Sequence, residues 1–150
     1  MAGEAMKAAT AVLEPELQRT GARREVLGRV VLGTVRGDIH EIGKTLVSTM
    51  LAAAGFEVHD LGVDVPADVF AEAARDRDAD IVGLSALLTT TMTGMRTTIE
   101  EFRKEGVKDQ FKFIVGGAPV NRTFADDIGA DGYGADAGSS VDLARRLLKG

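Results

Sequence analysis

Residues 34–50, TVRGDIHEIGKTLVSTM, lead from the end of an apolar run through a polar loop into a helical pattern. The run at 26–35 is rich in β-branched residues and predicts a strand. The pattern after the loop predicts a helix over 40–55 that ends at a glycine C-cap. Its apolar side chains share one helical face: Ile42, Leu46, Val47, Met50 and Leu51.

The alternation of strand and helix continues to the end of the chain. Further strands are predicted at 56–62, 79–85, 111–117 and around 129–133, and further helices from 66, over 92–105 and over 139–150. This regularity predicts an α/β fold with a parallel sheet and helices on both faces, and five strands favour the flavodoxin-like (Rossmann-like) order 2-1-3-4-5. Ligands of such sheets bind where the strand order reverses, here between the loops at 36–41 and 85–91.

The composition excludes several classes of protein. With 150 residues, 45% of them hydrophobic, the chain forms one core domain. It has no cysteine, which excludes disulfides and thiolate metal sites and favours a reducing, cytoplasmic location. A net charge of −5 without a basic stripe argues against nucleic acid as a partner. No apolar run is long enough to span a membrane.

The first residues differ from the rest of the chain. Residues 5–18 carry Val12 and Leu13 at helical spacing, and a polar stretch with Gly21 follows as a linker. We therefore expect an N-terminal helix in residues 1–20 and the α/β domain in residues 21–150.

The sequence Gly43-Lys44-Thr45 suggests a phosphate-binding loop, but the spacing does not fit. A Walker A loop needs a glycine five positions before the Gly-Lys pair, and Asp38 stands there. Its carboxylate would repel a phosphate. Lys44 is therefore interpreted as a solvated helix residue, and His59 as a structural or solvated one.

What remains is the motif Asp-x-His-x-x-Gly, formed by Asp38, His40 and Gly43. Histidine is a good metal ligand when a carboxylate holds its other ring nitrogen and fixes the tautomer. The alternative is a surface histidine beside an N-capping aspartate. One histidine is too few ligands for a bare zinc or iron ion, so a metal here must arrive with its other ligands attached.

Three further segments follow the later strands: GLSALLTTTMTGM at 83–95, VGGAP at 115–119 and GADGYGADA at 129–137. With the Asp-x-His-x-x-Gly motif before them, they give residues 25–149 a clear likeness. The chain resembles the methionine synthase-like cobalamin-binding domain, and most closely the corrinoid proteins of methyltransferase systems. The cofactor that this resemblance implies is cobalamin or a related corrinoid.

The resemblance also implies roles for individual residues. His40 is the lower axial ligand of cobalt and replaces the benzimidazole of the cofactor; Asp38 holds the other ring nitrogen, and Thr91 completes the relay. Ser85 and Thr89 bind the displaced nucleotide tail. The implied cofactor contacts are Gly37, Asp38, Ile39, His40, Ile42, Gly43, Ser85, Leu87, Thr89, Thr91, Gly116, Gly117, Tyr133, Gly134 and Ala137, with Asp38, His40 and Thr91 as the catalytic set.

The glycine pair and the threonines have alternative interpretations. In the family interpretation Gly116 and Gly117 let the tail pass, so a side chain added at Gly117 should point into the slot. Otherwise the glycines only make a tight turn, Ser85 only ends a strand, and the threonines cap a helix, with Thr91 as the N-cap.

The implied function is a methyl-group carrier whose cobalt cycles between Co(I) and methyl-Co(III), and which is not a complete enzyme alone. The Asp38–His40–Thr91 relay takes up a proton when His40 leaves cobalt. The implied partners are a methyl-donor-specific methyltransferase, a methyl-acceptor methyltransferase and a reductive activation protein. The N-terminal helix would be the remnant of a helical cap domain, absent through truncation.

Three alternatives to a methyl carrier remain open. The domain could be the cobalamin subunit of an adenosylcobalamin-dependent mutase or a cobalamin-dependent sensor. A receiver-like signalling domain fits less well, because it would need an aspartate at the end of the third strand, where Ser85 stands.

Overall fold

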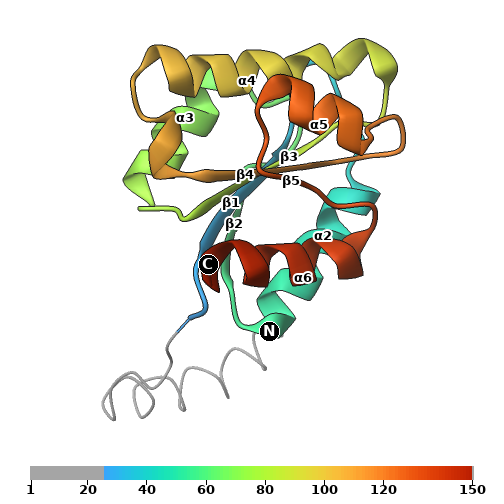
Figure 1. The fold of residues 1–150 in the computed structure, drawn as a ribbon. Coiled ribbons are helices and arrows are strands. Elements are labelled where there is room, and N and C mark those ends of the chain that lie inside the picture. The colour runs from blue at the N-terminus through green and yellow to red at the C-terminus, as the bar shows by residue number, and fades with distance from the viewer. Residues whose placement is uncertain (1–25, 150) are drawn as a thin grey trace, which may run out of the picture.

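The sheet of this protein is parallel and five-stranded, in the order β2-β1-β3-β4-β5 (Figure 1). The computed structural model describes residues 26–149. The strands are β1 (Arg29–Thr34), β2 (Glu57–Asp60), β3 (Ile81–Ser85), β4 (Lys112–Gly116) and β5 (Gly132–Tyr133). The predicted fold class and strand order are confirmed. The expected N-terminal helix and its linker lie outside the described residues.

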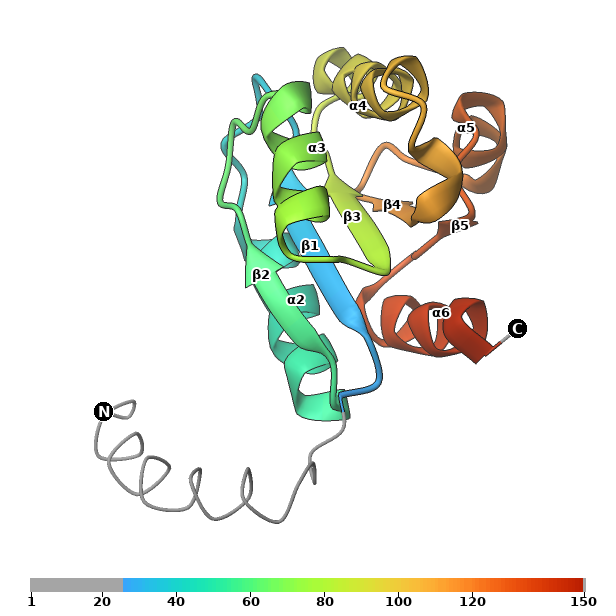
Figure 2. The same cartoon turned by 90° about the vertical axis from the view of Figure 1, so that its left-hand side faces the viewer.

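Helices cover both faces of the sheet. The helices are α2 (Ile42–Ala54), α3 (Ala67–Asp76), α4 (Thr93–Lys104), α5 (Arg122–Ile128) and α6 (Ala137–Lys149), with 3-10 turns η1 (Thr89–Thr91) and η2 (Lys108–Gln110). Figures 1 and 2 show α2 and α6 on one face and α3, α4 and α5 on the other. None of the helices in the described part of the chain has the length and apolar character that a membrane crossing requires.

Two of these helices differ from the sequence-based expectation. Helix α5 was not predicted, although Asn121 is its N-cap and accepts a hydrogen bond from the Phe124 N–H at 2.8 Å. Helix α6 begins at Ala137, two residues before the predicted start at 139. Both differences follow from short helices or helix ends rich in small and polar residues, whose periodicity is weak.

The two faces of the sheet are packed differently. On the α3, α4 and α5 face, the ring of Phe102 meets that of Phe113 edge to face, with 4.8 Å between ring centroids. The core on the α2 and α6 face is mostly aliphatic and smaller: Val30, Leu32, Leu51, Phe56, Ile81, Ile114, Val141 and Ala144. The first face is therefore tightly filled, and the second leaves space beside the sheet.

Helix α2 buries only part of the face that its apolar residues predict, since Leu51 is in the core. Ile42 is 88% exposed and Leu46 is 53% exposed. Besides Leu51, the helix buries Lys44, whose Nζ lies 2.6 and 2.7 Å from the two carboxylate oxygens of Asp60 at the end of β2. The interpretation of Lys44 as solvated was wrong, because the strand order places an acidic partner beside it.

We expect the substitution Asp60→Ala to lower the free energy of unfolding by about 2 kcal/mol, because it leaves the Lys44 ammonium buried. Glu41 Oε2 lies 3.7 Å from Lys44 Nζ, and this carboxylate compensates only in part for the loss of Asp60. Urea unfolding followed by circular dichroism measures this loss.

The double substitution Asp60→Ala with Lys44→Met should recover much of that loss, since it removes the unpaired charge. The control is Asp142→Ala, which breaks an exposed contact to Arg145 at 3.9 Å and should change the free energy by less than about 0.5 kcal/mol. A double variant as unstable as Asp60→Ala alone would contradict this account of Lys44.

Candidate functional site

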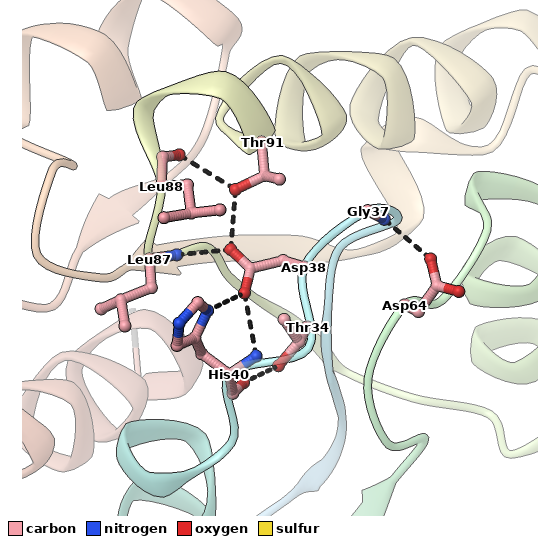
Figure 3. A network of polar contacts seen from close by, with 8 residues as sticks. All are labelled: Thr34, Gly37, Asp38, His40, Asp64, Leu87, Leu88 and Thr91. Atoms are coloured by element: carbon pink, nitrogen blue, oxygen red, sulfur yellow. Dashed lines mark hydrogen bonds and ion pairs between the residues drawn. The ribbon is translucent and has the colours of Figure 1, made fainter.

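The loop after β1 carries a fully buried carboxylate, Asp38. Its Oδ1 accepts a hydrogen bond from the His40 backbone N–H at 3.0 Å and lies 2.7 Å from His40 Nδ1. Its Oδ2 accepts from the Leu87 N–H and from the Thr91 hydroxyl, each at 2.7 Å (Figure 3). Asp38 thus joins the loops after β1 and β3, as the predicted strand order requires.

These contacts keep Asp38 ionised. Burial alone would raise the pKa of this carboxyl, but the hydrogen bonds from Leu87, Thr91 and His40 outweigh burial and hold the pKa well below its ordinary value of 3.8. Asp38 is therefore a carboxylate at neutral pH, surrounded by donors on both oxygens.

The carboxylate sets the tautomer of His40. An ionised carboxylate only accepts hydrogen bonds, so Nδ1 carries the proton that points at Asp38 Oδ1. Nε2 then has its lone pair available. The side chain is 45% exposed, so this nitrogen can be reached from outside the protein. A neutral imidazole held in this way is a metal ligand of fixed orientation.

Thr91 lies behind this pair. It belongs to the turn η1, and its Oγ1 is 2.7 Å from Asp38 Oδ2 and 2.9 Å from the Leu88 carbonyl oxygen. The carboxylate is the stronger acceptor of its single proton. Met92 occupies the N-cap position of α4, without a side-chain cap. The alternative interpretation of Thr91 as N-cap was therefore wrong.

The sequence did not predict the hydrogen bonds that join the loop between β2 and α3 to the loop after β1. Asp64 Oδ1 accepts a hydrogen bond from Gly37 N–H at 2.7 Å, and the Asp64 N–H donates to the Asp38 carbonyl oxygen at 2.9 Å. Asp64 has φ of 55°, a left-handed conformation that aspartate tolerates better than most residues. The signal for this turn was the spacing of Gly62, Asp64 and Pro66.

A cavity of about 650 Å³ opens beside His40, between α2, α6 and the sheet. Most of the predicted site residues line it: Ile39, His40, Ile42, Gly43, Ser85, Leu87, Gly116, Gly117, Tyr133, Gly134 and Ala137. Gly37, Asp38 and Thr91 are not part of its wall. Thr89 is exposed and is not part of the wall either.

Glycines allow segments of the chain to approach one another closely at the mouth of this cavity. A Cβ at Gly116 would lie 2.9 Å from the Gly134 carbonyl oxygen, and one at Gly134 would lie 2.1 Å from Ser140 Oγ. A Cβ at Gly117 would lie 1.7 Å from the Ala86 carbonyl oxygen. The expectation that a side chain at Gly117 points into the slot was wrong, because the Ala86 backbone blocks its way.

Sequence reasoning missed part of the cavity wall. Helix α2 contributes Lys44, Leu46, Val47 and Leu51, β3 contributes Gly83, and α6 contributes Ser140 and Ala144. A signal was present in α6, where Ala137, Ser140 and Ala144 put small side chains on one face at helical spacing. Small residues there leave room between the helix and the sheet.

The family model described as the B12 binding domain matches residues 28–142. Dimethylamine corrinoid protein 2 of Methanosarcina acetivorans is 50% identical over 150 residues, which is 100% of this chain and 69% of that protein. The structure of the monomethylamine corrinoid protein of Methanosarcina barkeri has a TM-score of 0.77 at 37% identity, covering 97% of this chain and 68% of that one. The methanol:cobalamin methyltransferase complex MtaBC of the same organism gives 0.80 at 33% identity, covering 89% and 51%.

We expect Asp38→Ala to lower the free energy of unfolding of the cofactor-free protein by about 2 to 3 kcal/mol, because it removes the shared acceptor of the His40 N–H, the Leu87 N–H and the Thr91 hydroxyl. His40→Ala should cost less than about 1 kcal/mol, since it removes one half-exposed partner. Chemical denaturation at pH 7 measures both values.

The pH dependence gives a second check on Asp38. A lowered pKa stabilises the folded state above the ordinary pKa of the carboxyl, and this contribution is lost as the pH falls towards the lowered value. In the His40→Ala background, which removes the imidazole from the comparison, the loss of stability that Asp38→Ala causes should therefore be constant from pH 6 to 8 and shrink below about pH 4. A difference that grows on acidification would contradict the assignment.

Proposed function

This chain belongs to the B12 binding domain family, its cofactor is cobalamin or a related corrinoid, and from this premise we propose that it is a methyl-group carrier of a methyltransferase system. The observation that carries the proposal is the Asp38–His40 pair, 2.7 Å apart, beside a cavity large enough for a nucleotide tail. Relatives named as dimethylamine corrinoid proteins support the methyltransferase class.

The residues present fit a corrinoid. His40 Nε2 is the nitrogen that would ligate cobalt, in place of the cofactor's own base. The glycines at 116, 117 and 134 hold the backbones close around the mouth of the cavity, where added Cβ atoms would clash. Ser85 and Tyr133 bring hydroxyl groups to the same mouth and would bind the polar part of the tail.

A bound corrinoid would supply a cobalt centre able to accept and donate a methyl group by cycling between Co(I) and methyl-Co(III). The chain's own residues manage the lower ligand. Asp38 holds the ring of His40 in place and keeps the proton on Nδ1. If Nε2 left the metal and took up a proton, the ionised Asp38 beside the ring would stabilise the added charge. Thr91 stabilises the charge on Asp38 from the other side.

A carrier needs proteins that load and unload it. We propose that one methyltransferase delivers the methyl group from its donor, that a second transfers it to an acceptor, and that a reductive activation protein restores the reduced metal. The solved complex named methanol:cobalamin methyltransferase supports an association of this kind. A cytoplasmic location belongs to the same proposal, since reduced cofactors need a reducing compartment.

The test is uptake of cobalamin by the purified protein. After incubation and gel filtration the protein fraction should carry the corrinoid absorption spectrum. His40→Ala should bind more weakly, by about 10- to 100-fold, and still retain the cofactor, because the cavity contacts survive. A colourless wild-type fraction would overturn the proposal.

Two further variants separate ligation from packing. His59→Ala is the matched control, because His59 pairs with Glu57 on β2 at 2.6 Å and lies outside the cavity wall; its uptake should equal that of wild type. Asp38→Asn should retain the cofactor but shift the Co(II)/Co(I) potential, since the carboxylate tunes the basicity of His40. An unchanged potential would remove Asp38 from this role.

A further inference from the structure

The cavity beside His40 has a mouth and a deep end, and the course of the two helices that line it shows where each lies. Helices α2 and α6 both start near the carboxyl ends of the strands and run back towards their amino ends. At the far end of α2 the Leu27 N–H donates to the Gly55 carbonyl oxygen at 2.9 Å, just before β1. At the far end of α6, Leu148 packs at Gly28. The distance of a residue from the carboxyl end of its strand therefore measures its depth in the cavity.

Polar side chains gather at the mouth. Ser85 and Tyr133 are the last residues of β3 and β5, and His40 lies in the loop after β1. Asp136 precedes α6, and Ser140 is one turn further in. The buried ammonium of Lys44 is already paired with Asp60. Hydrogen-bonding groups of side chains are thus concentrated where a phosphate and a ribose would enter.

The deep end is apolar. Ser85 at the mouth is four positions after Ile81, a rise of about 13 Å along β3. At that depth Val30 pairs with Ile81 in the sheet, and Leu51 and Ala144 face them from the two helices. The backbones of β1 and β3 are paired with neighbouring strands on both sides, so they offer few spare groups.

We call the deep end formed by Val30, Leu51, Ile81 and Ala144 the floor of the cavity. We infer that this floor selects the lower base of the corrinoid, favouring an apolar benzimidazole over a purine. The inference rests on the proposed function, because it assumes that the displaced tail enters the cavity. Adenine brings an exocyclic amino group and two further ring nitrogens that need hydrogen bonds, and among residues 26–149 the floor has no side chain that provides them. 5,6-Dimethylbenzimidazole brings two methyl groups, which fit an aliphatic floor.

The experiment compares three corrinoids on the cofactor-free protein by equilibrium dialysis: cobalamin, the cobamide with adenine as lower base, and cobinamide, which has no nucleotide. Cobalamin should bind about tenfold or more tighter than the adenine cobamide, because buried nitrogens without partners lose affinity. Cobinamide should bind the weakest of the three.

Substitutions at the floor test the assignment directly. Leu51→Gln adds an amide at the deep end and should shrink the preference for cobalamin severalfold; Val47→Gln, on the same wall, serves as the second variant if the first does not fold. Met50→Gln is the matched control, since Met50 is next to Leu51 but does not line the cavity, and it should keep the wild-type ratio.

The outcomes separate this inference from the proposed function. Equal affinity of the wild type for cobalamin and the adenine cobamide, or for cobalamin and cobinamide, overturns the inference while corrinoid binding stands. The same holds if folded Leu51→Gln and Val47→Gln keep the wild-type ratio. Failure of all three corrinoids to bind overturns the proposed function, and the inference falls with it.

Discussion

The buried carboxylate of Asp38 is the interaction on which the candidate site depends. A charge with no exposed surface is costly unless donors surround it, and here donors come from the loops after β1 and β3. The sheet order places those two loops next to each other at its reversal point. The same contact that stabilises the junction therefore also orients the ring of His40. Stability and ligand geometry have one physical cause at this position.

The second constraint is the unequal packing of the two faces of the sheet. Aromatic rings fill the face under α3, α4 and α5, whereas small residues of α6 and glycines of the strand ends leave a cavity under the other face. Exposed apolar residues on α2, such as Ile42 and Leu46, would be a liability in a protein without a ligand. We propose that they are surface that the corrinoid covers when it binds.

The sequence predicted the fold and the polar centre of the site well, for physical reasons that also explain the failures. Strand and helix alternation determined the strand order, and the order placed Asp38 and Thr91 together. Periodicity could not show that Lys44 finds Asp60, because that contact joins elements distant in sequence. Nor could it show what an added Cβ at Gly117 would meet, since the Ala86 backbone is placed there by tertiary packing. Asp64 was missed because its contacts to Gly37 and to the Asp38 carbonyl join two loops that are distant in sequence.

The central claim is that His40 replaces the base of the cofactor at cobalt, and electron paramagnetic resonance of the Co(II) form tests it most directly. Protein labelled with ¹⁵N-histidine is loaded with unlabelled cobalamin and reduced by one electron. The account predicts that the splitting from the axial nitrogen changes to that of a single ¹⁵N nucleus in the wild type, and that no such splitting appears in His40→Ala. A splitting that stays that of ¹⁴N in the labelled wild-type protein would show that the cofactor keeps its own base and would contradict the account.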